Sequence, residues 1–220
     1  MGGGWNGPAR DRWGAAFRPS WILAGAVGLS IAAAAGGRSA EASPLNSCIN
    51  AVKDFNAAVR LCTAVIESDG ATSHDKALAY AFRAYARWFA DHSDSSGQER
   101  ADLRQAVKLD PNIAEAYYVG GAIYEAQYQY AVAARDFDRS VELNFSIPTF
   151  LESAYYLRGV SHQILFTVTN DPSQCVVAIQ SFKMAIALGD TDKSEAVERR
   201  TKCENSIRRA AGAERESNGN

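Results

Sequence analysis

The sequence predicts an all-α protein, a solenoid of three to four helical hairpins with a capping helix at its C-terminal end. Two observations lead to this fold class: apolar residues follow helical spacing within residues 114–144, and the same pattern recurs along the chain. Residues three, four and seven positions apart share one face of an α-helix. The first apolar stripe consists of Tyr117, Gly120, Gly121 and Tyr124, and the second consists of Ala133, Phe137 and Ser140.

The recurring pattern is a six-residue segment that begins with Ala-Tyr and ends in Ala or Gly. It occurs at residues 79–84, 116–121 and 154–159, at intervals of 37 and 38 residues. A second apolar pattern follows each copy, and one more precedes them all. These second patterns begin at Ala58, Glu99, Ala133 and Ala178. The repeating unit is therefore a pair of helices.

This unit resembles the tetratricopeptide repeat, a pair of antiparallel helices of about 34 residues. In that family, small residues let the helix backbones approach, and aromatic residues fill the space between hairpins. Residues 114–147 match six of the seven family positions, and Phe145 stands where the family has a proline. The resemblance covers residues 54–188. It assigns packing positions to Tyr80, Ala84, Tyr117, Gly121, Tyr124, Ala133, Phe137, Tyr155, Gly159, Ala178 and Phe182.

Two of the units depart from the family pattern. The first full unit contains a polar segment, His92–Gly97, that is longer than the family's turn. The last unit carries an insertion, so we expect its first helix to extend through Phe166. That helix should end before Asn170-Asp171-Pro172, because proline stops a helix.

Composition and repeat position divide the chain into seven segments. They are a signal peptide (1–42), an N-terminal partial repeat (43–73), three tetratricopeptide-like repeats (74–111, 112–147 and, with the insertion, 148–190), a capping helix (191–211) and a disordered tail (212–220). We expect the capping helix because the last unit of a repeat array needs a solvated outer face.

The first 42 residues are typical of a secretory signal peptide. Three arginines precede the apolar stretch Trp21–Ala35, and Ala40-Glu41-Ala42 provides a cleavage motif. The stretch has 15 residues, fewer than the ~20 that span a bilayer. We therefore expect cleavage after Ala42 and a periplasmic or secreted protein.

Two alternatives to cleavage after Ala42 remain open. An uncleaved signal would anchor the chain in the inner membrane, and Leu45–Cys48 faintly resembles a lipidation motif. The mature chain has no second apolar segment that could cross a membrane. Removal of the signal changes the net charge from −2 to −4, so a nucleic-acid partner is not expected.

Four cysteines behind a signal peptide predict two disulfides. Cys48 and Cys62 lie at equal distances from the expected first turn, and Cys175 and Cys203 flank the turn at Gly189-Asp190. Such positions come level in an antiparallel hairpin, so we predict the pairs Cys48–Cys62 and Cys175–Cys203. The spacing fits neither a zinc site nor a C-x-x-C redox pair.

No catalytic or cofactor-binding motif is found in the sequence. His74 is interpreted as part of a helix start, His92 as a loop residue and His162 as a packing residue. Gly120-Gly121 falls inside a helix, where it favours packing over phosphate binding. We therefore expect no enzyme, no metal and no cofactor.

The resemblance implies that the first helix of each hairpin lines a concave groove. The groove positions correspond to Tyr85, Trp88, Glu115, Tyr118, Glu125, Tyr156 and Gln163. Their chemistry differs from the Lys/Asn/Arg clamp with which some family members bind C-terminal carboxylates. Their aromatic side chains could bind a peptide or a helix, or they could pack on neighbouring helices.

The expected function is a non-catalytic protein–protein interaction or scaffold module of the bacterial cell envelope. The expected partner is a protein or a peptide segment. The alternative is a structural subunit that associates with its own copy as a homo-oligomer.

Overall fold

The computed structural model describes residues 43–51, 54–90, 97–148, 150–189 and 193–218. Nine α-helices and no strands occur in these residues, which confirms the predicted all-α class. The helices are α2 (Pro44–Asn50), α3 (Phe55–Glu67), α4 (Ser73–Ala90), α5 (Gln98–Leu109), α6 (Ala114–Ala126), α7 (Tyr130–Glu142), α8 (Phe150–Thr169), α9 (Pro172–Leu188) and α10 (Ser194–Asn218). The predicted signal peptide lies outside the described residues.

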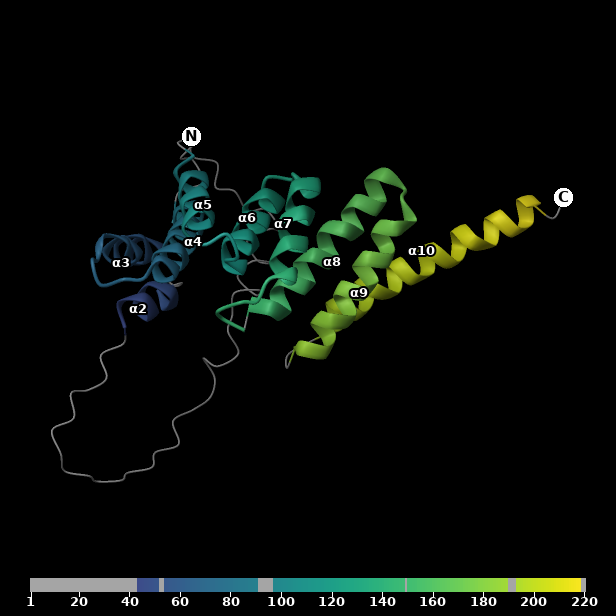
Figure 1. The fold of residues 1–220 in the computed structure, drawn as a ribbon. Coiled ribbons are helices and arrows are strands. Elements are labelled where there is room, and N and C mark those ends of the chain that lie inside the picture. The colour runs from purple at the N-terminus through teal and green to yellow at the C-terminus, as the bar shows by residue number, and fades with distance from the viewer. Residues whose placement is uncertain (1–42, 52–53, 91–96, 149, 190–192, 219–220) are drawn as a thin grey trace, which may run out of the picture.

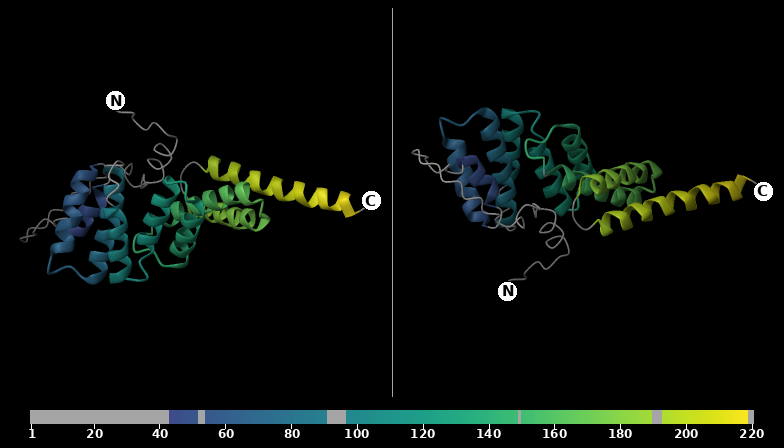
Figure 2. Two further views of the ribbon diagram at one scale, coloured as in Figure 1. Left: turned by 90° about the horizontal axis from the view of Figure 1, so that it is seen from above. Right: turned by 90° about the horizontal axis from the view of Figure 1, so that it is seen from below.

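Consecutive helices pack side by side as hairpins, and the hairpins stack along the chain (Figure 1). α4 packs with α5, α6 with α7, and α8 with α9, while α2 and α3 cover the N-terminal end of the stack. The array is elongated in the two further views, and α10 runs along α9 and then beyond the hairpins (Figure 2). This order follows the succession of units read from the sequence.

Short polar side chains determine where helices begin. The Thr72 hydroxyl accepts a hydrogen bond from the Asp75 backbone N–H, and the Asp75 carboxylate accepts one from the Thr72 N–H, both at 3.1 Å. This reciprocal pair is a capping box at the start of α4. Asp171 caps α9 by accepting from the Ser173 N–H at 2.9 Å, which satisfies one of the free donors of the first turn.

The first helix of the last hairpin is long, as the inserted residues predict. α8 extends through Phe166 to Thr169. Asn170 then adopts the left-handed conformation, with φ of 54°, and Pro172 begins α9. Asparagine tolerates this conformation better than most residues, so the turn forms where the sequence placed it.

Small residues allow aromatic rings to reach the backbone of the neighbouring helix. A Cβ added at Gly121 would lie 2.9 Å from the ring of Phe137, and one added at Gly159 would lie 2.7 Å from the ring of Phe182. Both rings are fully buried. The other predicted packing residues are either buried (Ala84, Ala133 and Ala178) or half-buried (Tyr80, Tyr117, Tyr124 and Tyr155).

The C-terminal helix is longer than predicted. We expected a capping helix over 191–211 and a disordered tail from Gly212, but α10 continues to Asn218. Apart from Gly212, residues 208–216 are Ala, Arg and Glu, which are among the strongest helix formers. A single glycine costs only about 1 kcal/mol in a helix, so it does not end this one.

Two further sequence features concern the limits of the described chain. Most of the polar segment His92–Gly97 lies outside the described residues, and Gly97 precedes α5 with a φ of 70°. None of the described helices is both long enough and apolar enough to cross a membrane.

Candidate functional site

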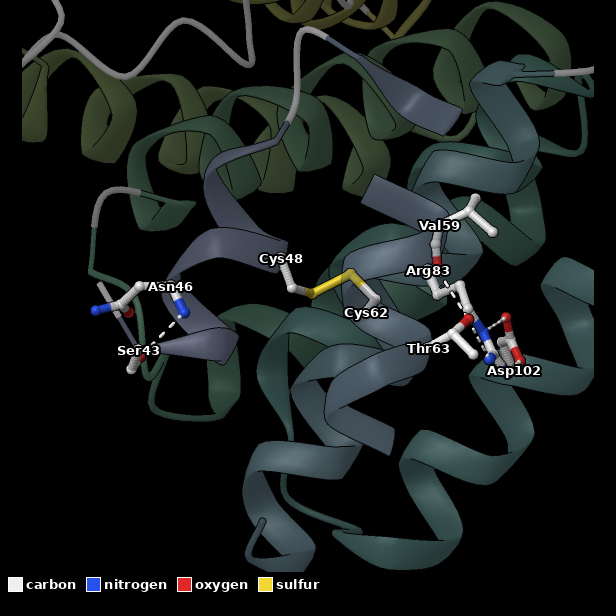
Figure 3. The surroundings of a disulfide bond; sticks show 8 residues. All are labelled: Ser43, Asn46, Cys48, Val59, Cys62, Thr63, Arg83 and Asp102. Carbon is white, nitrogen blue, oxygen red and sulfur yellow. Dashed lines mark hydrogen bonds and ion pairs between the residues drawn. A yellow bond between two sulfur atoms is a disulfide. The ribbon is translucent and has the colours of Figure 1, made fainter. Parts of the chain in front are cut away.

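The N-terminal end of the array is held by a disulfide. Cys48 of α2 and Cys62 of α3 are bonded with an S–S distance of 2.05 Å, as the spacing predicts (Figure 3). Both residues are buried, at 1% and 0% exposure. Ser43 caps α2 by accepting a hydrogen bond from the Asn46 N–H at 3.2 Å. The bridge therefore fixes a short capped helix to the first full helix of the stack.

The second predicted disulfide is not formed. Cys175 of α9 and Cys203 of α10 come together as predicted, close enough for a hydrogen bond between their side chains. Both are free, buried thiols. Burial raises the pKa of each thiol. The raised pKa values favour the thiol form of both side chains over the reactive thiolate.

Four of the predicted groove residues belong to the interior. They are Tyr85, Glu115, Tyr118 and Glu125, with exposed fractions between 1% and 6%. The Tyr118 ring packs against Phe145 and Phe150, which lie after α7 and at the start of α8. These four residues stabilise the array and offer no surface to a partner, which corrects their assignment to an open groove. The family pattern alone did not show that the chain leading into α8 covers α6.

The capping helix covers the groove positions of the last hairpin. The Gln163 Oε1 atom accepts a hydrogen bond from Arg199 Nη1 at 2.9 Å, and its amide nitrogen donates to the Arg199 carbonyl at 3.3 Å. Tyr156 is also half-buried, and burial raises the pKa of its hydroxyl, with Arg199 and Glu195 as neighbours. Trp88 is half-buried on the first hairpin. The inner face is thus largely closed within the chain.

Two arginines join successive hairpins through polar seams. Arg83 of α4 forms two hydrogen bonds with the Asp102 carboxylate of α5, at 2.7 and 3.0 Å, and a third with the Thr63 hydroxyl of α3 at 2.9 Å (Figure 3). Asp102 is 3% exposed. A paired, hydrogen-bonded carboxylate tolerates such burial, whereas a lone one does not. The repeat pattern of the sequence does not predict these contacts.

In the second seam an arginine again joins the helix before its own to the helix after it. Here the carboxylate lies on the preceding helix and the hydroxyl on the following one. Arg158 of α8 donates to the Asp138 carboxylate of α7 at 2.6 Å and to the Ser181 hydroxyl of α9 at 2.8 Å. His162 also contacts Asp138, at 3.1 Å. Burial acts to raise the pKa of Asp138, but the hydrogen bonds with His162 and Arg158 outweigh it and hold that pKa below its usual value.

His74, at the start of α4, contacts two residues that lie in the connections after α5 and after α7. Its Nδ1 atom lies 2.7 Å from Asp110 Oδ2, and its Nε2 atom lies 2.9 Å from the Ser146 hydroxyl. The hydrogen bond with His74 is the largest cause that holds the pKa of Asp110 below its usual value. The sequence around His74 predicts only a helix start. The 36-residue separation between His74 and Asp110, close to one repeat length, was the signal that could have found the pair.

This Ser–His–Asp order is the order found in serine hydrolases, but a hydrolase also needs free N–H groups for an oxyanion. Here the Ile147 N–H donates to the Glu115 carboxylate at 2.9 Å. Glu115 is 1% exposed, and burial raises its pKa. The Ile147 N–H is therefore engaged with Glu115 and is not free to bind an oxyanion.

Within the described residues, no group of three or more His, Cys, Asp or Glu side chains could hold a metal ion. The comparisons with known proteins add no family assignment. No protein-family model matches the chain, and it matches neither a curated protein nor a solved structure.

Proposed function

We propose that the chain is an exported, non-catalytic protein-interaction module of the bacterial cell envelope, related to the tetratricopeptide-repeat proteins. The repeat spacing and the stacked hairpins support the relationship. The Cys48–Cys62 bond supports export, because disulfides persist mainly in oxidising compartments.

The observation that supports a protein-binding role is a set of exposed apolar residues on the last hairpin, which we call the apolar strip. The strip consists of Val168 at the end of α8 and Val176, Met184 and Leu188 on α9, with exposed fractions of 75%, 51%, 42% and 42%. The three α9 residues lie eight and four positions apart, within about 120° of the helix surface, and the exposed Gln180 lies between Val176 and Met184. The other faces of α9 pack on α8 and α10. Large apolar side chains exposed on one side of a hairpin are a feature of protein-binding surfaces.

A protein partner at this strip is tested by charge substitution. The double variant Val176→Asp, Met184→Asp should lose the proteins that the wild-type chain retains from an extracytoplasmic extract, measured by quantitative mass spectrometry. Leu61→Asp is the matched control, because Leu61 is an exposed apolar residue on α3, at 38% exposure. Retention of the same proteins by all three chains would contradict the proposal.

Self-association is the second candidate function, because the same apolar strip could pair with its own copy. Sedimentation velocity over a wide concentration range distinguishes the two. The proposal predicts a monomer at all concentrations. A dimer that forms with concentration and is abolished by the double variant would favour self-association.

A further inference from the structure

The three hairpins place equivalent residues at each seam, and the central seam differs from its neighbours. Arg83, Gly120 and Arg158 occupy the same position in the three recurring segments. In the first and last hairpins the arginine bridges the second helix of its own hairpin and the second helix before it. Each of those seams therefore holds one carboxylate with at least one guanidinium, and Arg87 adds a second guanidinium to Asp102 at 2.7 Å.

The central seam has the carboxylate but a glycine in place of the arginine. Asp136 of α7 is the positional equivalent of Asp102 and Ser181, each directly before the aromatic or leucine of its helix. A Cβ added at Gly120 would lie 2.8 Å from Asp136 Oδ2. The Asp136 carboxylate thus lies over the point where, in the neighbouring seams, the arginine side chain begins.

Asp136 is only partly exposed, and in the part of the chain that the structure describes no cation forms an ion pair with it. No hydrogen bond or ion pair joins it to another described residue, and Arg104, the equivalent of Thr63 and Asp138, is exposed to solvent. Burial raises the pKa of Asp136 to about 6, against a smaller opposing effect of Arg135. A carboxylate in this state gains from a hydrogen-bonding cation.

We propose that the central seam, formed by Gly120 and Asp136, binds an arginine side chain supplied by a protein partner. The neighbouring seams show the chemistry: a planar guanidinium donates to one carboxylate and to a second polar atom across two helices. The short Asp136 side chain must turn away from Gly120 to receive it. The polypeptide source of the arginine rests on the proposed function, whereas the chemistry of the site does not.

The experiment follows the Asp136 carboxyl carbon by NMR in the full chain. The probe is N-acetyl-arginine methylamide, and the matched control ligand is the citrulline analogue, which has the same shape without the charge. The arginine probe should lower the pKa of Asp136 saturably, because it stabilises the carboxylate, and the citrulline probe should not. Gly120→Arg should abolish probe binding by supplying the guanidinium from within, and Asp136→Asn should abolish it by removing the acceptor.

Three results would overturn the inference. The first is an equal shift of the Asp136 pKa with both probes. The second is undiminished binding of the arginine probe by Asp136→Asn, judged from the Gly120 amide signal. The third is an Asp136 that titrates below pH 4 without any probe. The last result would mean that Arg104 or Arg135 already fills the seam. The Val176→Asp, Met184→Asp variant should still bind the arginine probe. If this variant loses the protein partner but still binds the arginine probe, the two proposals are shown to be independent, so the apolar strip and the arginine site can fail separately.

Discussion

At the scale of single residues, Gly159 shows how closely the helices approach. A methyl group at this position would lie 2.7 Å from the Phe182 ring. We predict that Gly159→Ala lowers the free energy of unfolding by about 1–2 kcal/mol, because overpacking outweighs the helix-propensity gain of alanine. Urea unfolding of the disulfide-intact chain measures this.

Gly212 of α10 is the matched control for that substitution. A Cβ there meets no atom within 4 Å. Gly212→Ala should therefore leave stability unchanged or raise it by up to about 1 kcal/mol. Equal effects of the two substitutions would show that Gly159 is not a close-packing position.

The second residue-scale prediction concerns Asp136. Its pKa is raised to about 6 in the folded chain, so the folded state holds a proton that the unfolded state releases near pH 4. Stability from this group is present below pH 4 and is lost as the pH rises through 6. Asp136→Asn should thus stabilise the chain by roughly 1 kcal/mol at pH 7.5, after allowance for solvent screening, and by nothing at pH 4.

Asp138 provides the opposite sign two residues away. Its pKa is lowered in the folded chain, so its carboxylate stabilises the fold above the unfolded pKa and stops doing so as the pH falls through the folded one. Asp138→Asn should destabilise the chain at pH 7.5, and this loss should shrink toward acid pH in urea titrations. The same pH trend for both variants would contradict the electrostatic description of the two seams.

The sequence predicted the packing residues better than the polar contacts. Small residues at Gly121 and Gly159 and aromatics at Phe137 and Phe182 repeat with the hairpin, so spacing alone identified them. The arginines of the seams also repeat, but Arg83 pairs with Asp102 on the following helix and Arg158 with Asp138 on the preceding one. A search for identical residues at a fixed spacing finds the arginines. It does not find their acids, because the acid lies on a different helix relative to each arginine.

At the scale of elements, the disulfide determines how firmly α2 is held. Cys48 and Cys62 are separated by 14 residues, and closure of such a loop stabilises a fold by ~3 kcal/mol in the chain-entropy description. We predict that Cys48→Ala, Cys62→Ala loses about this much in urea unfolding. Reductant should destabilise the wild type by a similar amount and leave the double variant unchanged, and equal sensitivity of both chains to reductant would contradict this.

The positions of the helices were predicted more accurately than the burial of their side chains by neighbouring segments. The long α8 followed from the insertion and from Pro172. The burial of Tyr118 did not follow, because it depends on Phe145 and Phe150 packing over α6 from the next connection. Residues that come together across a loop of irregular length leave no periodic signal in the sequence.

At the scale of the whole molecule, the all-α hairpin array followed from the repeat itself. Each hairpin buries its apolar face only against a neighbour, so a recurring pair of helices implies a stack. Tyr118 and α10 help to close the inner face, so the proposed contact surface lies on the exposed face of α9 instead. The function proposed here then depends on the chain reaching an oxidising compartment with that face exposed.

The intact mass of the chain recovered from cells tests that export most directly. The protein is alkylated in denaturant, with and without reductant. Cleavage after Ala42 and the single Cys48–Cys62 bond predict a chain that begins at Ser43 and carries two alkyl groups without reductant, from Cys175 and Cys203, and four with it. A chain that retains residues 1–42, or one that takes up four alkyl groups without reductant, would contradict the account.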